Sequence, residues 1–131
     1  MTEAPRNTPD PWDDAEVISV YSREQALADG VLVDVSPMAR EAGFKVPVAT
    51  TASLSALLDP SPDDAALGQS FEGRLWDVLM VLRANARAGD TVHFDVIVAS
   101  GGKQQRVTMK AVIGPGDNAE PVITVMLPTE D

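Results

Sequence analysis

The sequence contains no cysteine and a single histidine, His93. The absence of cysteine excludes disulfides, thiolate nucleophiles and every cysteine-ligated zinc or iron–sulfur site. No apolar run approaches the roughly 20 residues that a membrane-spanning helix needs. The first residues, "MTEAPRNTPDPWDD", lack the basic stretch and the apolar core of a signal peptide. Together these absences predict a soluble cytoplasmic protein.

Basic residues are also scarce, because 10 Lys and Arg face 20 Asp and Glu, and the formal net charge is −10. A field of this sign repels nucleic-acid phosphates and anionic membrane surfaces. We therefore expect no direct binding of nucleic acid and no membrane contact. The acidic excess either keeps the protein soluble or is presented to a protein partner with a basic surface.

The length of 131 residues and the apolar fraction of 44% are typical of one folded domain. Residues 1–14 are rich in proline and acid and poor in apolar side chains, so we expect a mobile N-terminal arm followed by one α+β domain over residues 15–131. Trp12 is the only aromatic residue of the arm. It either packs against the domain or anchors a partner.

The N-terminal half predicts short alternating elements. Val17–Tyr21 is β-rich, and Ser22 with Gln25 has the capping-box spacing of a following helix. Val31–Val35 has the composition of a strand, and "FKVPVAT" is extended, with Pro47 placing it at a sheet edge. The proline- and aspartate-rich stretch "DPSPDDAALGQS" predicts a surface loop.

The C-terminal half predicts one long helix and a three-stranded antiparallel meander. "FEGRLWDVLMVLRANARAG" has apolar residues on every side at its middle, which is typical of a helix that is buried nearly all round. "TVHFDVIVA", "QQRVTMKAVI" and "PVITVMLP" alternate like strands with one apolar face, which should pack on that helix. The other face carries His93 and Asp95 beside Arg106 and Lys110.

The stretch "GPGDN", Gly114–Asn118, could be a ligand loop or a turn. A phosphate loop would need a lysine followed by serine or threonine and a helix, which are absent. A calcium loop would need acidic oxygens at several alternate positions, and only Asp117 and Glu120 are available. We interpret the stretch as the turn between two strands, with a protein-contact loop as the alternative.

No residue combination points to a catalytic site. His93 and Asp95 share a strand face, but no serine or cysteine nucleophile accompanies them in a recognised pattern. Asp29 and Asp34 stand at helix ends, where such residues are common. We therefore predict no catalytic residue, cofactor or metal. A small enzyme with a cleft lined by Asp29, Asp34 and Arg40 is the third alternative for the function.

Three segments carry a family resemblance: "EVISVYSREQALADGVLVDVSPMAREAGFKVPVAT", "EGRLWDVL" and "VTMKAVIGPGDNAEPVITVMLPTED". They resemble an uncharacterised family of short acidic proteins found on plasmids, integrative elements and phages, and also in bacterial chromosomes. No activity is established for this family. The resemblance therefore implies only a context, that of a cytoplasmic accessory protein often carried by mobile DNA.

Charge and context together predict a non-enzymatic protein-binding factor of a mobile genetic element. The narrower expectation is an anti-defence inhibitor, anti-CRISPR or anti-restriction, that mimics DNA by presenting an acidic surface to a nucleic-acid-handling complex. The alternative is an accessory or regulatory protein of plasmid or phage maintenance, and both a monomer and a homodimer paired through a sheet edge remain open. The predicted partner-binding residues are Trp12, Asp13, Asp14, Glu16, Asp59, Asp63, Asp64 and Glu72.

Overall fold

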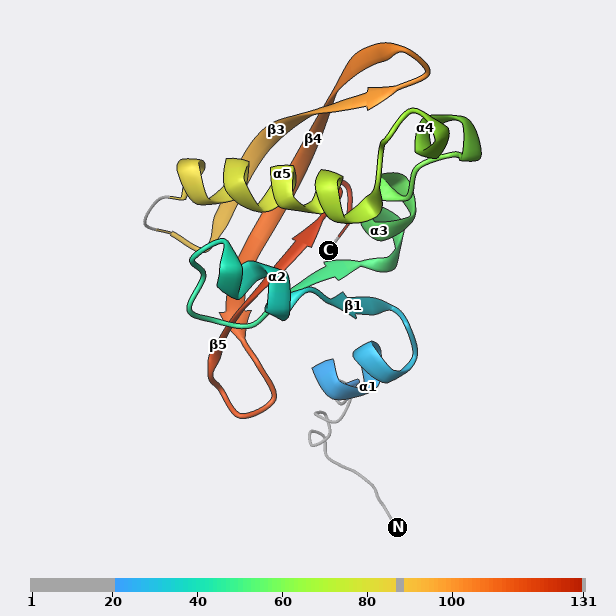
Figure 1. Ribbon diagram of the computed structural model, residues 1–131. Coiled ribbons are helices and arrows are strands. Elements are labelled where there is room, and N and C mark those ends of the chain that lie inside the picture. The colour runs from blue at the N-terminus through green and yellow to red at the C-terminus, as the bar shows by residue number, and fades with distance from the viewer. Residues whose placement is uncertain (1–20, 87–88, 131) are drawn as a thin grey trace.

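The computed structural model describes residues 21–86 and 89–130. The predicted arm lies outside these ranges, as do strand residues 17–20 and four of the predicted partner-binding residues, Trp12, Asp13, Asp14 and Glu16. In chain order the elements are α1 (Arg23–Ala28), β1 (Leu32–Asp34), α2 (Ser36–Glu41), β2 (Val48–Thr51), α3 (Ala52–Leu58), α4 (Pro62–Ala66), α5 (Phe71–Asn85), β3 (Thr91–Ser100), β4 (Lys103–Pro115) and β5 (Pro121–Met126) (Figure 1). The prediction of an α+β fold is confirmed.

The strands form one five-stranded mixed sheet in the order β1-β2-β5-β4-β3. The pairs β3–β4 and β4–β5 are antiparallel, as the predicted meander requires, and β1–β2 is antiparallel as well. The pair β2–β5 is parallel and joins the two halves of the chain. The C-terminal meander is therefore part of a larger sheet that the sequence did not predict.

The prediction that "FKVPVAT" forms an edge strand is wrong, because β2 lies between β1 and β5. Pro47 is tolerated there because it precedes the strand, which begins at Val48. Its carbonyl accepts a hydrogen bond from the Ile123 amide at 2.9 Å, a contact that needs no N–H from proline. The edges of the sheet are β1 and β3.

One face of the sheet carries the core, which is covered by α2, α3 and α5 (Figure 1). The α5 stripe of Leu75, Val78, Leu79 and Leu82 is buried against it. The prediction that α5 is buried nearly all round is wrong, because Trp76 is 37% and Met80 38% exposed. Both lie on the side of α5 away from the buried stripe.

The predicted alternation is confirmed in β3 but is wrong for β5, where Val122 and Ile123 are both buried, as are Val125 and Met126. Phe94, Val96 and Val98 are buried under α5, whereas His93, Asp95 and Ile97 are exposed on the opposite face. On that face the Asp95 carboxylate accepts a hydrogen bond from the Thr108 hydroxyl at 2.7 Å and lies 3.7 Å from the Arg106 guanidinium. Exposed contacts of this kind fix strand register more than they add stability.

Candidate functional site

The stretch predicted as a surface loop between α3 and α5 contains a helix, α4, whose Asp64 forms a buried ion pair with Arg74 of α5. The Asp64 carboxylate accepts hydrogen bonds from the Gly101 amide at 3.0 Å, the Ser100 hydroxyl at 3.1 Å and the Arg74 guanidinium at 3.3 Å. The Gly101 amide contributes most to holding the pKa of Asp64 below its usual value, although burial acts in the opposite direction. Asp64 thus joins α4 to the β3–β4 turn.

Arg74 extends the same network from α5. Its guanidinium also donates to the Ala99 carbonyl at 2.7 Å and to the Leu58 carbonyl at 3.3 Å. Because Asp64 is 4% and Arg74 6% exposed, neither side chain is presented to a partner. The prediction of Asp64 as a partner-binding residue is therefore wrong, because its carboxylate is buried in an ion pair with Arg74 that only the tertiary structure creates.

A second set of residues on α3, α4, α5 and the segments between them is exposed, and we call it the acidic helical face. Its members are Leu57, Asp59, Asp63, Leu67, Glu72, Trp76, Asp77 and Met80. Between Ala52 and Leu82 the only basic residue is Arg74, which is buried. All the charge that this stretch exposes is consequently negative.

The acidic helical face combines predicted and unpredicted residues. Asp59, Asp63 and Glu72 were predicted from the sequence and are exposed there. Trp76 and Met80 were missed, because the sequence predicted that the middle of α5 is buried nearly all round. The signal that could have found them is the four-residue spacing from Glu72, which places all three on one side of the helix.

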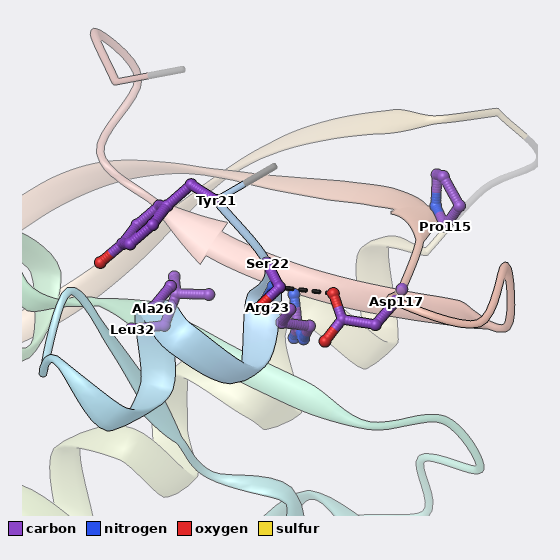
Figure 2. A pocket seen from close by; sticks show the side chains of 8 residues that line it. Tyr21, Ser22, Arg23, Ala26, Leu32, Pro115 and Asp117 are labelled. Carbon is purple, nitrogen blue, oxygen red and sulfur yellow. Dashed lines mark hydrogen bonds between the residues drawn. The ribbon is translucent and has the colours of Figure 1, made fainter. Parts of the chain in front are cut away.

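A hollow of 640 Å³ lies on another part of the molecule, beside α1, and is lined by residues of α1, β1 and the β4–β5 turn (Figure 2). The Asp117 carboxylate points at the start of α1 and accepts hydrogen bonds from the amides of Arg23 at 2.8 Å and Glu24 at 3.0 Å. The stretch "GPGDN" does lead into the turn between two strands, as predicted, but Gly114 and Pro115 still pair within β4 and the turn begins at Gly116. Its aspartate has the further task of capping a helix that is distant in sequence.

The cation and the phenol at this hollow are also engaged within the protein. The Arg23 guanidinium donates to the Thr124 hydroxyl at 2.8 Å and to the Ile123 carbonyl at 3.0 Å. Partial burial lowers the pKa of Arg23, and nearby carboxylates, including Asp117, oppose the shift. The Tyr21 hydroxyl donates to Asp29 at 2.9 Å, which raises the pKa of Tyr21. These contacts tie α1 to the sheet, so both the Arg23 guanidinium and the Tyr21 hydroxyl at this hollow already have partners within the protein.

The residues of the alternative enzyme do not meet in one cleft. Asp34 and Arg40 line a hollow of 440 Å³, whereas Asp29 lines a different hollow of 350 Å³ with Thr51 and Glu130. Among the described residues, no group of His, Cys, Asp and Glu is arranged to hold a metal ion. Within the same ranges, no helix has the length and apolarity needed to span a membrane.

The fold and the exposed residues define an α+β protein with an acidic helical face. Residues 10–131 match a family of unknown function, DUF6573, and the chain belongs to this family. Searches of curated proteins and of solved structures gave no match. The family match agrees with the expected membership of an uncharacterised family, while occurrence on mobile DNA stays a prediction.

Proposed function

We propose that the protein is a non-enzymatic protein-binding factor that docks its acidic helical face onto a basic surface of another protein. The observation that supports this most is the exposure of Trp76 and Met80 among carboxylates on α5. A face that served solubility alone would need only the charges. Trp and Met are enriched in protein interfaces, and Trp is among the residues that most often dominate binding energy.

The carboxylates of this face supply attraction at longer range. Asp59, Asp63, Glu72 and Asp77 add to a net charge of −10, which raises the association rate with a positively charged surface and disfavours acidic partners. Proteins that handle nucleic acids carry such surfaces in their phosphate-binding grooves. The narrower form of the proposal is therefore an inhibitor of a defence complex that cleaves nucleic acid, whose groove the face would occupy.

A pull-down from host lysate with charge-matched variants tests the proposal. Glu72→Gln/Asp77→Asn neutralises two carboxylates of the acidic helical face, and Glu41→Gln/Asp90→Asn neutralises two exposed carboxylates elsewhere. Each variant changes the net charge from −10 to −8. We expect the first variant to lose a captured basic protein and the second to retain it, because the location of the charge decides binding.

The contribution of apolar side chains to binding is tested by a matched pair of alanine variants. Trp76 on α5 and Ile113 on β4 are both 37% exposed. We expect Trp76→Ala to weaken capture by about tenfold or more, which is typical of an aromatic anchor, and Ile113→Ala to leave it unchanged. Thermal unfolding verifies that both variants are folded.

Two further measurements distinguish binding in a specific groove from non-specific adsorption: the salt dependence of capture and competition with nucleic acid. Capture that weakens as salt rises, together with displacement of nucleic acid from the captured protein, supports the proposal. Equal loss of capture in the test and control variants, or no loss in either, would overturn it.

A further inference from the structure

Over Thr91–Ile97, the outer edge of β3 lacks the prolines, lysines and bulges that usually protect an edge strand from pairing with another chain. β3 is an edge strand of ten residues, "TVHFDVIVAS", which contains no proline, glycine or lysine. Its register with β4 is continuous from Thr91 to Ser100, with no bulge. Natural edge strands are normally shortened, bulged, charged with lysine or covered, because their free amide and carbonyl groups are a template for another chain.

Two hydrogen bonds show which residues direct their backbone groups outward. The Asp90 carbonyl accepts from the Ile113 amide, so Asp90 faces β4. The Ala99 carbonyl accepts instead from Arg74, so Ala99 faces the outer edge, and Arg74 closes the edge there. Because backbone direction alternates along an antiparallel strand, the odd-numbered residues face outward.

Four odd-numbered residues remain before Arg74 closes the edge: Thr91, His93, Asp95 and Ile97. All four are exposed. Among the described residues, no hydrogen-bond partner is assigned to their outward amide and carbonyl groups. The free edge therefore offers alternating donors and acceptors over the length of a typical strand.

We propose that this edge pairs antiparallel with β3 of a second copy of the chain, about a two-fold axis at Phe94. Only a two-fold axis at position 94 places all four free residues of one copy opposite the four free residues of the other. Thr91 then faces Ile97, and His93 faces Asp95, twice each across the axis. The two five-stranded sheets become one continuous sheet, and the free backbone groups of each copy are satisfied by the other.

The chemistry of this register favours a second copy over an unrelated strand. The His93 ring can donate to the Asp95 carboxylate of the facing strand, which makes a favourable cross-strand pair, and the β-branched Thr91 and Ile97 face one another. Because each copy carries a net charge of −10, the two repel one another at long range. Added salt should therefore strengthen the dimer, whereas it should weaken binding of a basic partner by the acidic helical face. The two proposals are independent and respond to salt in opposite directions.

Sedimentation over a range of protein concentrations, with a pair of His93 variants, tests the dimer. His93→Pro removes an amide that points outward and leaves the β3–β4 hydrogen bonds in place, whereas His93→Thr keeps the amide. The proline variant deletes two hydrogen bonds per dimer, so its dissociation constant should rise about thirtyfold relative to the threonine variant. A chain that stays monomeric to several hundred micromolar, or a dimer that both variants form equally, would overturn the proposal.

Cross-linking tests the register without relying on a proline substitution. The chain has no native cysteine, so mixing the single variants His93→Cys and Asp95→Cys can give only engineered disulfides. Facing residues in a hydrogen-bonded antiparallel pair have Cα atoms about 5.5 Å apart, which suits a disulfide. We expect the mixture to form a disulfide-linked heterodimer. A mixture of His93→Cys with Lys103→Cys, which lies at the β3–β4 turn, should not. Equal cross-linking in both mixtures, or none in the first, would contradict the register.

Discussion

The contact between Asp117 and α1 allows a prediction whose size follows from counting hydrogen bonds. The first four amides of a helix have no partner within it. In α1 all four are satisfied: Ser22 by the Gln25 side chain at 3.3 Å, Gln25 by the Ser22 hydroxyl at 3.0 Å, and Arg23 and Glu24 by Asp117 at 2.8 and 3.0 Å. The distant turn therefore supplies half of the capping.

Asp117→Ala removes both of its bonds and returns two amides to water. A hydrogen bond at an exposed position contributes about 1 kcal/mol net, so the loss is about 2 kcal/mol. This corresponds to an increase of about thirtyfold in the equilibrium for local opening of α1. Since α1 has only six residues, it has little stability of its own to offset the loss.

Hydrogen exchange of the α1 amides measures this opening directly. The amides of Ala26, Asp29 and Val31 are bonded within or just after α1 and should exchange about thirtyfold faster in Asp117→Ala. Asn118→Ala alters the next residue of the same turn, keeps the carboxylate and should change exchange by less than about twofold. Unchanged exchange in Asp117→Ala, or equal acceleration in both variants, would refute the capping argument.

The remaining predictions concern the core and two titrating groups. Leu79→Ala, at a fully buried position, should lower the free energy of unfolding in urea by about 2–5 kcal/mol, whereas Leu67→Ala, at a position 73% exposed, should change it by less than about 0.5 kcal/mol; similar losses would contradict the assigned core. The folded-state pKa of Asp64 is depressed, so its stabilisation is present above the unfolded pKa of about 3.9 and is lost as the pH falls through the folded value. As the pH falls from 5 to the acid transition, the free energy of unfolding should therefore decrease less in Asp64→Asn than in the wild type. An equal decrease in the two proteins would refute the stabilising role of the Asp64 carboxylate. Tyr21 is the only tyrosine, so its ionisation is visible in the ultraviolet absorbance. Asp29→Asn should move that ionisation to lower pH, because Asp29 raises the pKa of Tyr21, and an unmoved titration would contradict the hydrogen bond.

Local signals in the sequence predicted local structure well. The predicted capping box of Ser22 and Gln25 is present at the start of α1. The alternation in β3 assigned Phe94 and His93 to opposite faces correctly. Each of these features depends on residues within a few positions of one another, and so a short window contains all the relevant interactions.

Predictions that needed a distant partner were less successful. Pro47 indicated an edge strand because a proline lacks an amide donor. However, β5, which lies about 75 positions later in the chain, pairs with β2 and needs only the carbonyl of Pro47 as an acceptor. Asp64 looked like one more solvated aspartate, but Arg74 lies within hydrogen-bonding distance. The exposed side of α5 was missed because the residues next to Trp76 and Met80 in the sequence do not distinguish an exposed apolar side chain from a buried one.

By itself the sequence determined the class of fold, the two faces of β3, the helix start at Ser22 and the strongly negative charge, because these follow from composition or from patterns among neighbouring residues. The tertiary structure alone decided that β2 is central, that Asp64 is buried, that Asp117 caps α1 and that the outer edge of β3 is free. These properties arise from contacts between segments far apart in the chain, and the free energy of such contacts depends on which surfaces the folded chain brings together.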